Sequence, residues 1–126
     1  MNQRSLDRLK GVKQILVDIL VEASKDSPYR FEIPADGGLR TAERQNELFK
    51  KRASKIDGYK IKGEHQKGNA FDIFLLIDGT ASWDKTKLTK VARHIQEVAD
   101  FEFGIKLTWG GDWKRFVDMP HFQLPK

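Results

Sequence analysis

The sequence predicts an α+β fold in which a small, mostly antiparallel sheet packs with about three helices. Segments whose apolar residues recur every three or four positions are interleaved with short apolar or alternating segments, the patterns of helices and strands. The last candidate strands lie too close in sequence for helical crossovers, so part of the sheet must be antiparallel. The length of 126 residues suits a single domain, expected over residues 1–126.

The first half of the chain contains two predicted helices and one strand. A helix over about residues 4–24 follows from seven apolar positions on one face: Leu6, Leu9, Val12, Leu16, Ile19, Leu20 and Ala23. A short strand is predicted at 30–34, where Phe31 and Ile33 alternate with polar residues. Thr41 can cap the second helix, which has Leu48 and Phe49 on one face.

The second half contains the clearest strand, at 70–77, after a basic segment (50–64) that we expect to be a loop. Asp78 and Gly79 turn the chain into a helix from about Asp84 to Phe101. The tail, 105–124, predicts two or three short strands around a turn at Gly110-Gly111.

The composition is that of a soluble globular protein, with 39% hydrophobic and 33% charged residues. There is no cysteine, which excludes disulfides, thiolate zinc sites and a cysteine nucleophile. The net charge of +5 either serves solubility or favours an anionic partner, such as nucleic acid, an envelope polymer or a membrane surface.

The N-terminal apolar pattern is helical and is interrupted by Asp18, unlike a signal peptide. No stretch approaches the roughly 20 apolar residues of a membrane span. We therefore expect synthesis in the cytoplasm without an export signal, and no membrane span.

An acidic residue, Asp72, stands inside the apolar run 70–77, where an unpaired carboxylate would be costly. His65 precedes it by seven residues, and Gly68 allows a turn between them. A metal site, a catalytic pair and a structural hydrogen bond all remain open. A serine triad is not expected, because no G-x-S-x-G motif exists.

A second histidine–carboxylate pair, Asp118 and His121, lies in the apolar tail. The two converge only if the backbone bends between them, and Pro120 marks such a bend. Two histidines and one carboxylate suit a catalytic zinc, and Asp118 could then exchange protons. A lone histidine in an apolar run is more often a core residue, and His94, on the third helix, is expected to be solvated.

These residues resemble a known family in three blocks that cover about residues 37–124. The blocks are 37-GGLRTAERQNELF-49, then H-x-x-G-x-A-x-D at His65, Gly68, Ala70 and Asp72, and D-x-P-H-F at Asp118, Pro120, His121 and Phe122. The family is that of the zinc D-Ala-D-Ala carboxypeptidases and L-alanyl-D-glutamate endopeptidases, with the Hedgehog/DD-peptidase fold.

The resemblance implies that His65, Asp72 and His121 bind one Zn²⁺. It also implies that Asp118 is the general base and acid, and that Arg40 lies near the scissile carbonyl or holds a substrate carboxylate. One departure is Gly63, where the family usually has serine.

The aspartate form of the last motif, the small size and the basic charge resemble the phage endolysin branch. This implies cleavage of the L-Ala–D-Glu bond of the peptidoglycan stem peptide, by a monomer that reaches the wall through a holin-like pore. Two alternatives stay open: a D-Ala-D-Ala carboxypeptidase or dipeptidase, whose second cationic anchor is not found, and a non-catalytic zinc module. Nucleic acid is not an expected partner, because no binding motif is present.

Trp109 and Trp113 flank the glycine turn. They either line the substrate groove or belong to the core, which is the commoner place for tryptophan in a small domain.

Overall fold

The computed structural model describes all residues, 1–126, and confirms the α+β prediction. It has four α-helices, one 3₁₀-helix and two three-stranded sheets. The helices are α1 (Gln3–Arg8), α2 (Gln14–Ser24), α3 (Ala42–Lys50), α4 (Lys85–Phe103) and η1 (Gly110–Asp112). None of them is both long and apolar enough to cross a membrane.

Both sheets are antiparallel throughout. One has the order β1 (Arg30–Glu32), β3 (Phe74–Ile77), β4 (Thr80–Ser82), and the other has the order β2 (Ala70–Asp72), β6 (His121–Gln123), β5 (Thr108–Trp109). β6 is the central strand of its sheet, and its register sets His121 opposite Asp72. The strand pairing thus brings together two of the candidate site residues.

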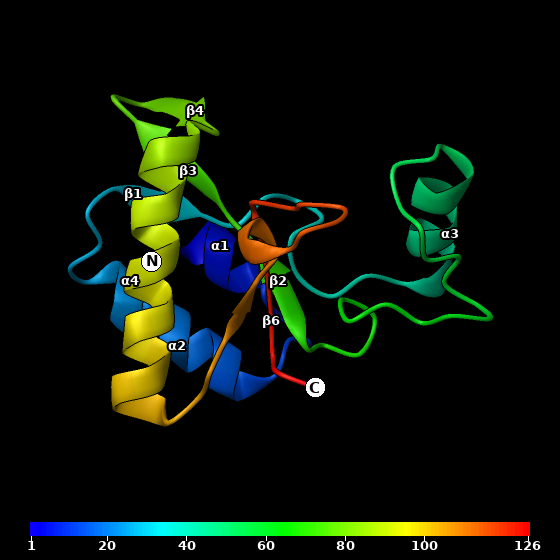
Figure 1. The fold of residues 1–126 in the computed structure, drawn as a ribbon, viewed down its shortest axis with the longest axis horizontal. Coiled ribbons are helices and arrows are strands. Elements are labelled where there is room, and N and C mark those ends of the chain that lie inside the picture. Colours follow the sequence, from blue (N-terminus) through cyan, green and yellow to red (C-terminus); the bar gives the residue numbers. More distant parts are fainter.

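The core lies where α2 and α4 pack on one another and on the sheets (Figure 1). Asp84 caps α4 by accepting a hydrogen bond from the Lys87 amide, and Gly104 ends the helix in the left-handed conformation. The Phe71 and Phe122 rings, from β2 and β6, stack with centroids 5.1 Å apart beneath the site. This packing gives the strands that carry Asp72 and His121 a rigid base.

The prediction of one helix over 4–24 is wrong, because the chain breaks between α1 and α2. Gly11 lies in the left-handed region at φ +87°, and the Lys13 amide donates to the Gly68 carbonyl oxygen. A Cβ on Gly68, itself at φ +74°, would lie 2.6 Å from the Gly11 oxygen. The break therefore lets two glycine backbones meet and anchors the turn that follows His65.

The prediction of one strand over 70–77 is also wrong in its extent. The run divides at Ile73, whose amide donates to the Pro120 carbonyl oxygen, so β2 and β3 belong to different sheets. Asp72 thereby stands at the end of β2, at the junction between the two sheets.

The second helix begins as predicted, with the Thr41 hydroxyl accepting from the Arg44 amide. Together with the segment that follows it, α3 projects away from the body formed by α2, α4 and the sheets (Figure 1). Residues 51–69 contain turns and bends but no helix or strand, as expected for a loop.

Candidate metal centre

Three side chains far apart in the sequence converge on one point. His65 Nε2 lies 3.2 Å from His121 Nδ1, and Asp72 Oδ1 lies 3.3 Å from each of these nitrogens. Both histidines are buried, at 5% and 6% exposure, and the Asp72 side chain is 16% exposed. Three possible ligand atoms therefore face one another within the protein.

In each histidine, the hydrogen bond of the nitrogen that faces away from Asp72 determines which nitrogen carries the proton. His65 Nδ1 lies 2.9 Å from the Gly38 carbonyl oxygen, which can only accept, so Nδ1 donates and Nε2 keeps its lone pair. His121 Nε2 lies 2.7 Å from Gln123 Oε1, which leaves the His121 Nδ1 lone pair facing the same point. When both rings are neutral, two lone pairs and a carboxylate oxygen therefore converge on one point.

The other oxygen of Asp72 is held by Arg40. Arg40 Nη2 donates to Asp72 Oδ2 at 3.1 Å, whereas Asp72 Oδ1 is buried and has no hydrogen-bond partner. Burial alone would raise the pKa of the Asp72 carboxyl, but the adjacent imidazoles of His121 and His65, in their protonated forms, outweigh it and hold the pKa well below its usual range. The carboxylate is therefore available, in its ionised form, to a cation.

The residues fit a zinc ion. With bonds of about 2.0–2.2 Å, the donor atoms of a tetrahedral zinc site lie about 3.3–3.6 Å apart. The three measured separations, 3.2, 3.3 and 3.3 Å, are close to this spacing. Imidazole nitrogen and carboxylate oxygen are also ligand types that zinc accepts, and each histidine has the outer acceptor typical of metal-bound histidines.

Asp118 lies beside the three candidate ligands, on the turn that precedes β6. The His121 amide donates to the Asp118 carbonyl oxygen at 3.1 Å, so the backbone bends at Pro120 between the two residues. Gly110 allows the bend, because a Cβ there would collide with the Asp118 carbonyl oxygen.

The surroundings of the Asp118 carboxyl shift its pKa, although the residue as a whole is exposed. Desolvation raises the pKa of Asp118, and the negative charge of Asp72 adds to this. The positive charges of His121 and His65, when these rings are protonated, and of Arg40 act in the opposite direction and are weaker. A carboxyl whose pKa is raised in this way is suited to accept a proton and return it.

The two tryptophans occupy different environments. Trp109 is 3% exposed and donates its indole N–H to the Met119 carbonyl oxygen, so it belongs to the core rather than to a substrate groove. Trp113 is half-buried, with its ring centroid 5.2 Å from that of His121. Of the two, only Trp113 therefore remains a candidate for substrate contact.

Sequence reasoning missed the residues that orient the site. Gln123 and the Gly38 carbonyl fix the two histidines, and Gln45 accepts from Arg40 Nη1 at 3.4 Å. The position of Gln123, two residues after His121 on one strand face, is a signal that could have pointed to it. No such signal marks Gly38, which meets His65 only through folding.

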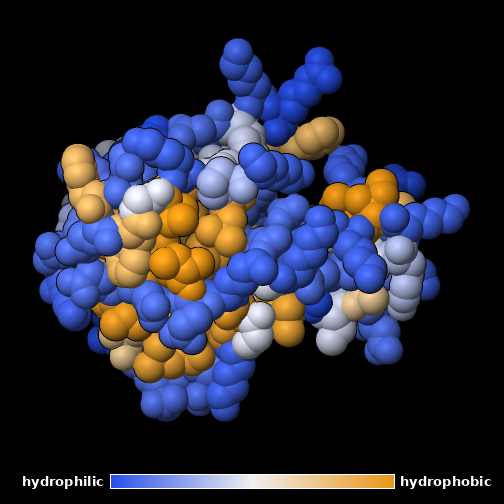
Figure 2. All heavy atoms as spheres, turned by 90° about the horizontal axis from the view of Figure 1, so that it is seen from below, coloured by the Kyte–Doolittle hydropathy of each residue, from blue (hydrophilic) through white to orange (hydrophobic).

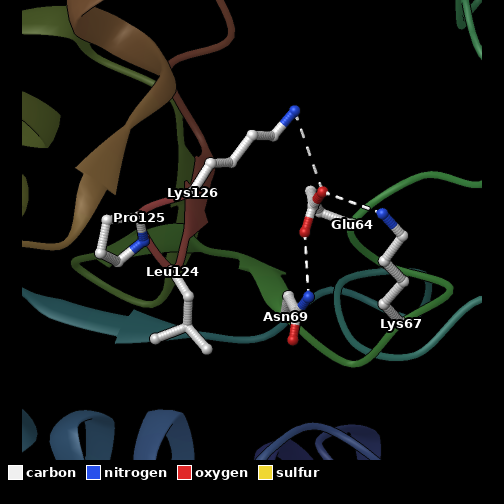
Figure 3. A pocket seen from close by; sticks show the side chains of 6 residues that line it. All are labelled: Glu64, Lys67, Asn69, Leu124, Pro125 and Lys126. Atoms are coloured by element: carbon white, nitrogen blue, oxygen red, sulfur yellow. Dashed lines mark hydrogen bonds and ion pairs between the residues drawn. The ribbon is translucent and has the colours of Figure 1, made fainter.

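A surface pocket next to His65 contains none of the candidate ligands (Figure 3). Its one carboxylate, Glu64, accepts from Asn69 Nδ2 at 3.0 Å and pairs with Lys67 and Lys126. Because that carboxylate is already paired, the pocket offers no free acid to a ligand.

Replacing Gln123 with leucine should weaken metal binding about 10- to 100-fold, because His121 would lose the acceptor that holds its Nε2 proton. Gln123→Glu, which keeps an oxygen at this place, should retain the affinity. Competition with a metal-binding dye measures both constants. Equal affinities for the leucine variant and the parent would contradict the role of Gln123.

Metal binding should weaken on acidification. Burial lowers the pKa of His121, but the Asp72 carboxylate and the Gln123 oxygen outweigh it, so the net pKa is raised. A raised pKa means that the metal-free protein retains this proton to higher pH, and the metal must displace it. Affinity should fall about ten-fold per pH unit below that pKa, measured between about pH 8 and pH 6. A constant affinity over this range would contradict the expectation.

Comparisons with known proteins agree on one family. The model of a family described as phage L-alanyl-D-glutamate peptidase matches residues 1–123. The chain is 30% identical over 116 residues to the L-alanyl-D-glutamate peptidase of Escherichia phage T5, covering 92% of this chain and 82% of that protein.

A bacterial relative and a solved structure are also similar. Peptidoglycan L-alanyl-D-glutamate endopeptidase CwlK of Bacillus subtilis (strain 168) is 35% identical over 95 residues, which are 69% of this chain but only 57% of that protein. The crystal structure of the Serratia marcescens L-Ala D-Glu endopeptidase ChiX matches with a TM-score of 0.87 and 32% identity, over 99% of this chain and 89% of that one.

Proposed function

The chain belongs to the phage L-alanyl-D-glutamate peptidase family, and on that premise we propose that it is a zinc-dependent endopeptidase that hydrolyses the L-Ala–D-Glu amide bond of the peptidoglycan stem peptide. The observation that carries the proposal is the convergence of His65 Nε2, His121 Nδ1 and Asp72 Oδ1 beside Asp118. The names of the relatives support the choice of bond. No observation favours the carboxypeptidase alternative.

His65, Asp72 and His121 would hold one zinc ion. When bound, zinc supplies Lewis acidity, which makes water more acidic and polarises a carbonyl oxygen. The outer contacts of the ligands, from Gly38, Gln123 and Arg40, keep the three donor atoms directed at the metal position.

Asp118 is the proposed general base and acid. Its carboxylate takes a proton from the attacking water as the water oxygen bonds to the scissile carbonyl carbon. The same carboxyl then gives that proton to the departing nitrogen as the C–N bond breaks, which leaves an alanyl carboxylate and a D-Glu amine. The partial desolvation of this carboxyl raises its pKa and so favours the first transfer, in which the carboxylate accepts the proton.

Arg40 has two proposed tasks. Its Nε donates to the Asp36 carbonyl oxygen at 3.2 Å and its Nη2 to Asp72, which fixes both the guanidinium and the ligand carboxylate. A guanidinium has five N–H donors, so with the bond to Gln45 two of them remain free for a substrate oxygen. These free donors are suited to the scissile carbonyl or to a substrate carboxylate.

The test is digestion of purified peptidoglycan, with new amino termini identified by mass spectrometry. The proposal predicts new D-Glu amino termini, loss of the activity with a chelator and its return with zinc. Release of terminal D-Ala alone would replace the endopeptidase with a carboxypeptidase. If the folded, zinc-loaded protein releases no product from several wall types, the remaining explanation is a non-catalytic zinc-containing binding module.

A further inference from the structure

The positive charge of the protein is concentrated in one segment. Residues 50–62, named here the basic arm, contain six lysine or arginine residues and one aspartate, a net charge of +5. This equals the net charge of the whole chain, so the other residues are neutral in sum. The arm begins at Lys50, the last residue of α3, and belongs to the part of the molecule that projects from the body (Figure 1).

The cations of the basic arm have no anionic partners within the protein. All six are exposed and none forms a salt bridge: Lys50, Lys51, Arg52, Lys55, Lys60 and Lys62. The one acid, Asp57, is occupied by its own turn, accepting from the amides of Tyr59 and Ile61. Elsewhere, Lys25, Arg44 and Arg93 have carboxylates within 2.9 Å. The arm therefore offers its charge to a partner.

Bulky apolar side chains accompany these charges. Tyr59 and Ile61 are each 58% exposed, although both are large enough to favour burial. In the space-filling view, hydrophilic residues dominate the projecting side of the molecule and small apolar groups interrupt them (Figure 2). A surface with this mixture suits a partner that is anionic and also carries methyl groups or sugar faces.

Hydrogen bonds connect the basic arm to residues next to the candidate metal centre. Gln66, next to His65, donates to the Gly58 carbonyl oxygen at 2.8 Å and accepts from the Gly63 amide at 2.9 Å. Gln45, which accepts from Arg40, donates to the Ile56 carbonyl oxygen at 3.1 Å. A ligand on the arm thus lies on a segment held directly by neighbours of His65 and Arg40.

The arm also meets the loop that leads to Asp118. Lys55 Nζ lies 5.4 Å from the centroid of the Phe116 ring, which is 71% exposed. Lys114 and Arg115, in the same loop, are exposed and have no salt bridge. The two loops form one basic surface next to the catalytic residues.

We infer that the basic arm, with Lys114 and Arg115, is a docking surface for the peptidoglycan polymer itself. The inference rests on the proposed function and extends it from the scissile bond to the surrounding wall. Peptidoglycan is a polyanion, because its stem peptides carry free carboxylates, including one on the D-Glu after the scissile bond. The lysines engage these carboxylates, and Tyr59 and Ile61 contact methyl groups and sugar faces.

The structure favours the wall over an anionic membrane. Membrane-surface segments are usually amphipathic helices with a continuous apolar face, whereas residues 51–62 form turns and bends. The attachment of the arm to the turn of His65 also suits a ligand that must reach the catalytic residues.

The test compares two variants with the same loss of charge, both carrying Asp118→Asn so that the wall is not digested. The arm variant is Lys51→Gln, Lys60→Gln, Lys62→Gln. The control is Lys13→Gln, Lys85→Gln, Lys90→Gln, whose lysines are exposed, unpaired and outside the basic surface. Binding to peptidoglycan freed of accessory polymers is measured by co-sedimentation at about 20 mM and about 500 mM salt, which differ in screening length.

The arm variant should bind at least about ten-fold more weakly than the control at low salt, and its affinity should depend less on salt. Equal losses in both variants, or none in the arm variant, would overturn the inference. Binding by the parent to vesicles of anionic phospholipid, but not to the walls, would replace it with a membrane surface. Because binding is measured without hydrolysis, failure of the proposed activity would show separately, in the digestion assay.

Discussion

Asp118→Asn should lower the rate of stem-peptide hydrolysis about 10²–10⁴-fold, the usual contribution of a general acid–base residue. Asparagine keeps the shape of the side chain and its backbone turn but cannot accept the proton. Metal content should stay at the level of the parent, since Asp118 is not among the three converging donors. The measurements are rates on purified peptidoglycan and the metal content of the same samples.

The variant should also fold normally, which separates a chemical effect from a structural one. The raised pKa of Asp118 means that the folded protein binds this proton more tightly than the unfolded chain does. The ionised carboxylate therefore opposes folding at neutral pH, and the neutral amide should leave the metal-free Tm equal or higher. Asp18→Asn, on the exposed side of α2, is a control that should retain full activity. If the Asp118→Asn variant digests walls as fast as the parent, the general base must be another residue.

His121→Ala should abolish both metal binding and hydrolysis. Alanine removes one of three donors and leaves Asp72 Oδ1 with only His65 to share a cation. Zinc held by two protein ligands falls short of the three found in catalytic sites, so a chelating dye should remove it easily. The measurements are zinc stoichiometry after gel filtration and the gain in Tm on adding zinc, which is expected for the parent and not for the variant.

His94→Ala is the matched control for this experiment. Contrary to the expectation of a solvated side chain, His94 is partly buried, and its Nε2 lies 2.9 Å from the Ala23 carbonyl oxygen at the end of α2. Its loss should lower stability somewhat and leave zinc stoichiometry unchanged. Full zinc occupancy in His121→Ala would remove His121 from the ligand set.

The caps and periodicities of α3 and α4 could be predicted because they are local. Thr41 and Asp84 satisfy amides three residues away, and the buried face of α4 follows from its own spacing. The class of fold followed from the same patterns. Elements whose limits depend on distant contacts were predicted less well.

The break at Gly11 shows why. Apolar spacing continues across residues 9–16 and predicts an unbroken helix, yet the Lys13 amide bonds to Gly68, which lies 55 positions later. Likewise the run 70–77 looks like one strand, but Ile73 bonds to Pro120 and separates two sheets. In both places a long-range backbone contact overrides local propensity.

The sequence by itself determined which chemical groups this protein has for a site: two histidines, an aspartate within an apolar run, a second aspartate and an arginine, in the order of a known family. Only the tertiary structure decided how those groups face one another. His65 takes its tautomer from Gly38, 27 positions away, and Asp72 has one oxygen held by Arg40, 32 positions away, while its other oxygen is left without a hydrogen bond. The orientation of these side chains depends on partners that come close only when the chain folds. The nitrogen and oxygen atoms that they can offer to a metal depend only on the residue types.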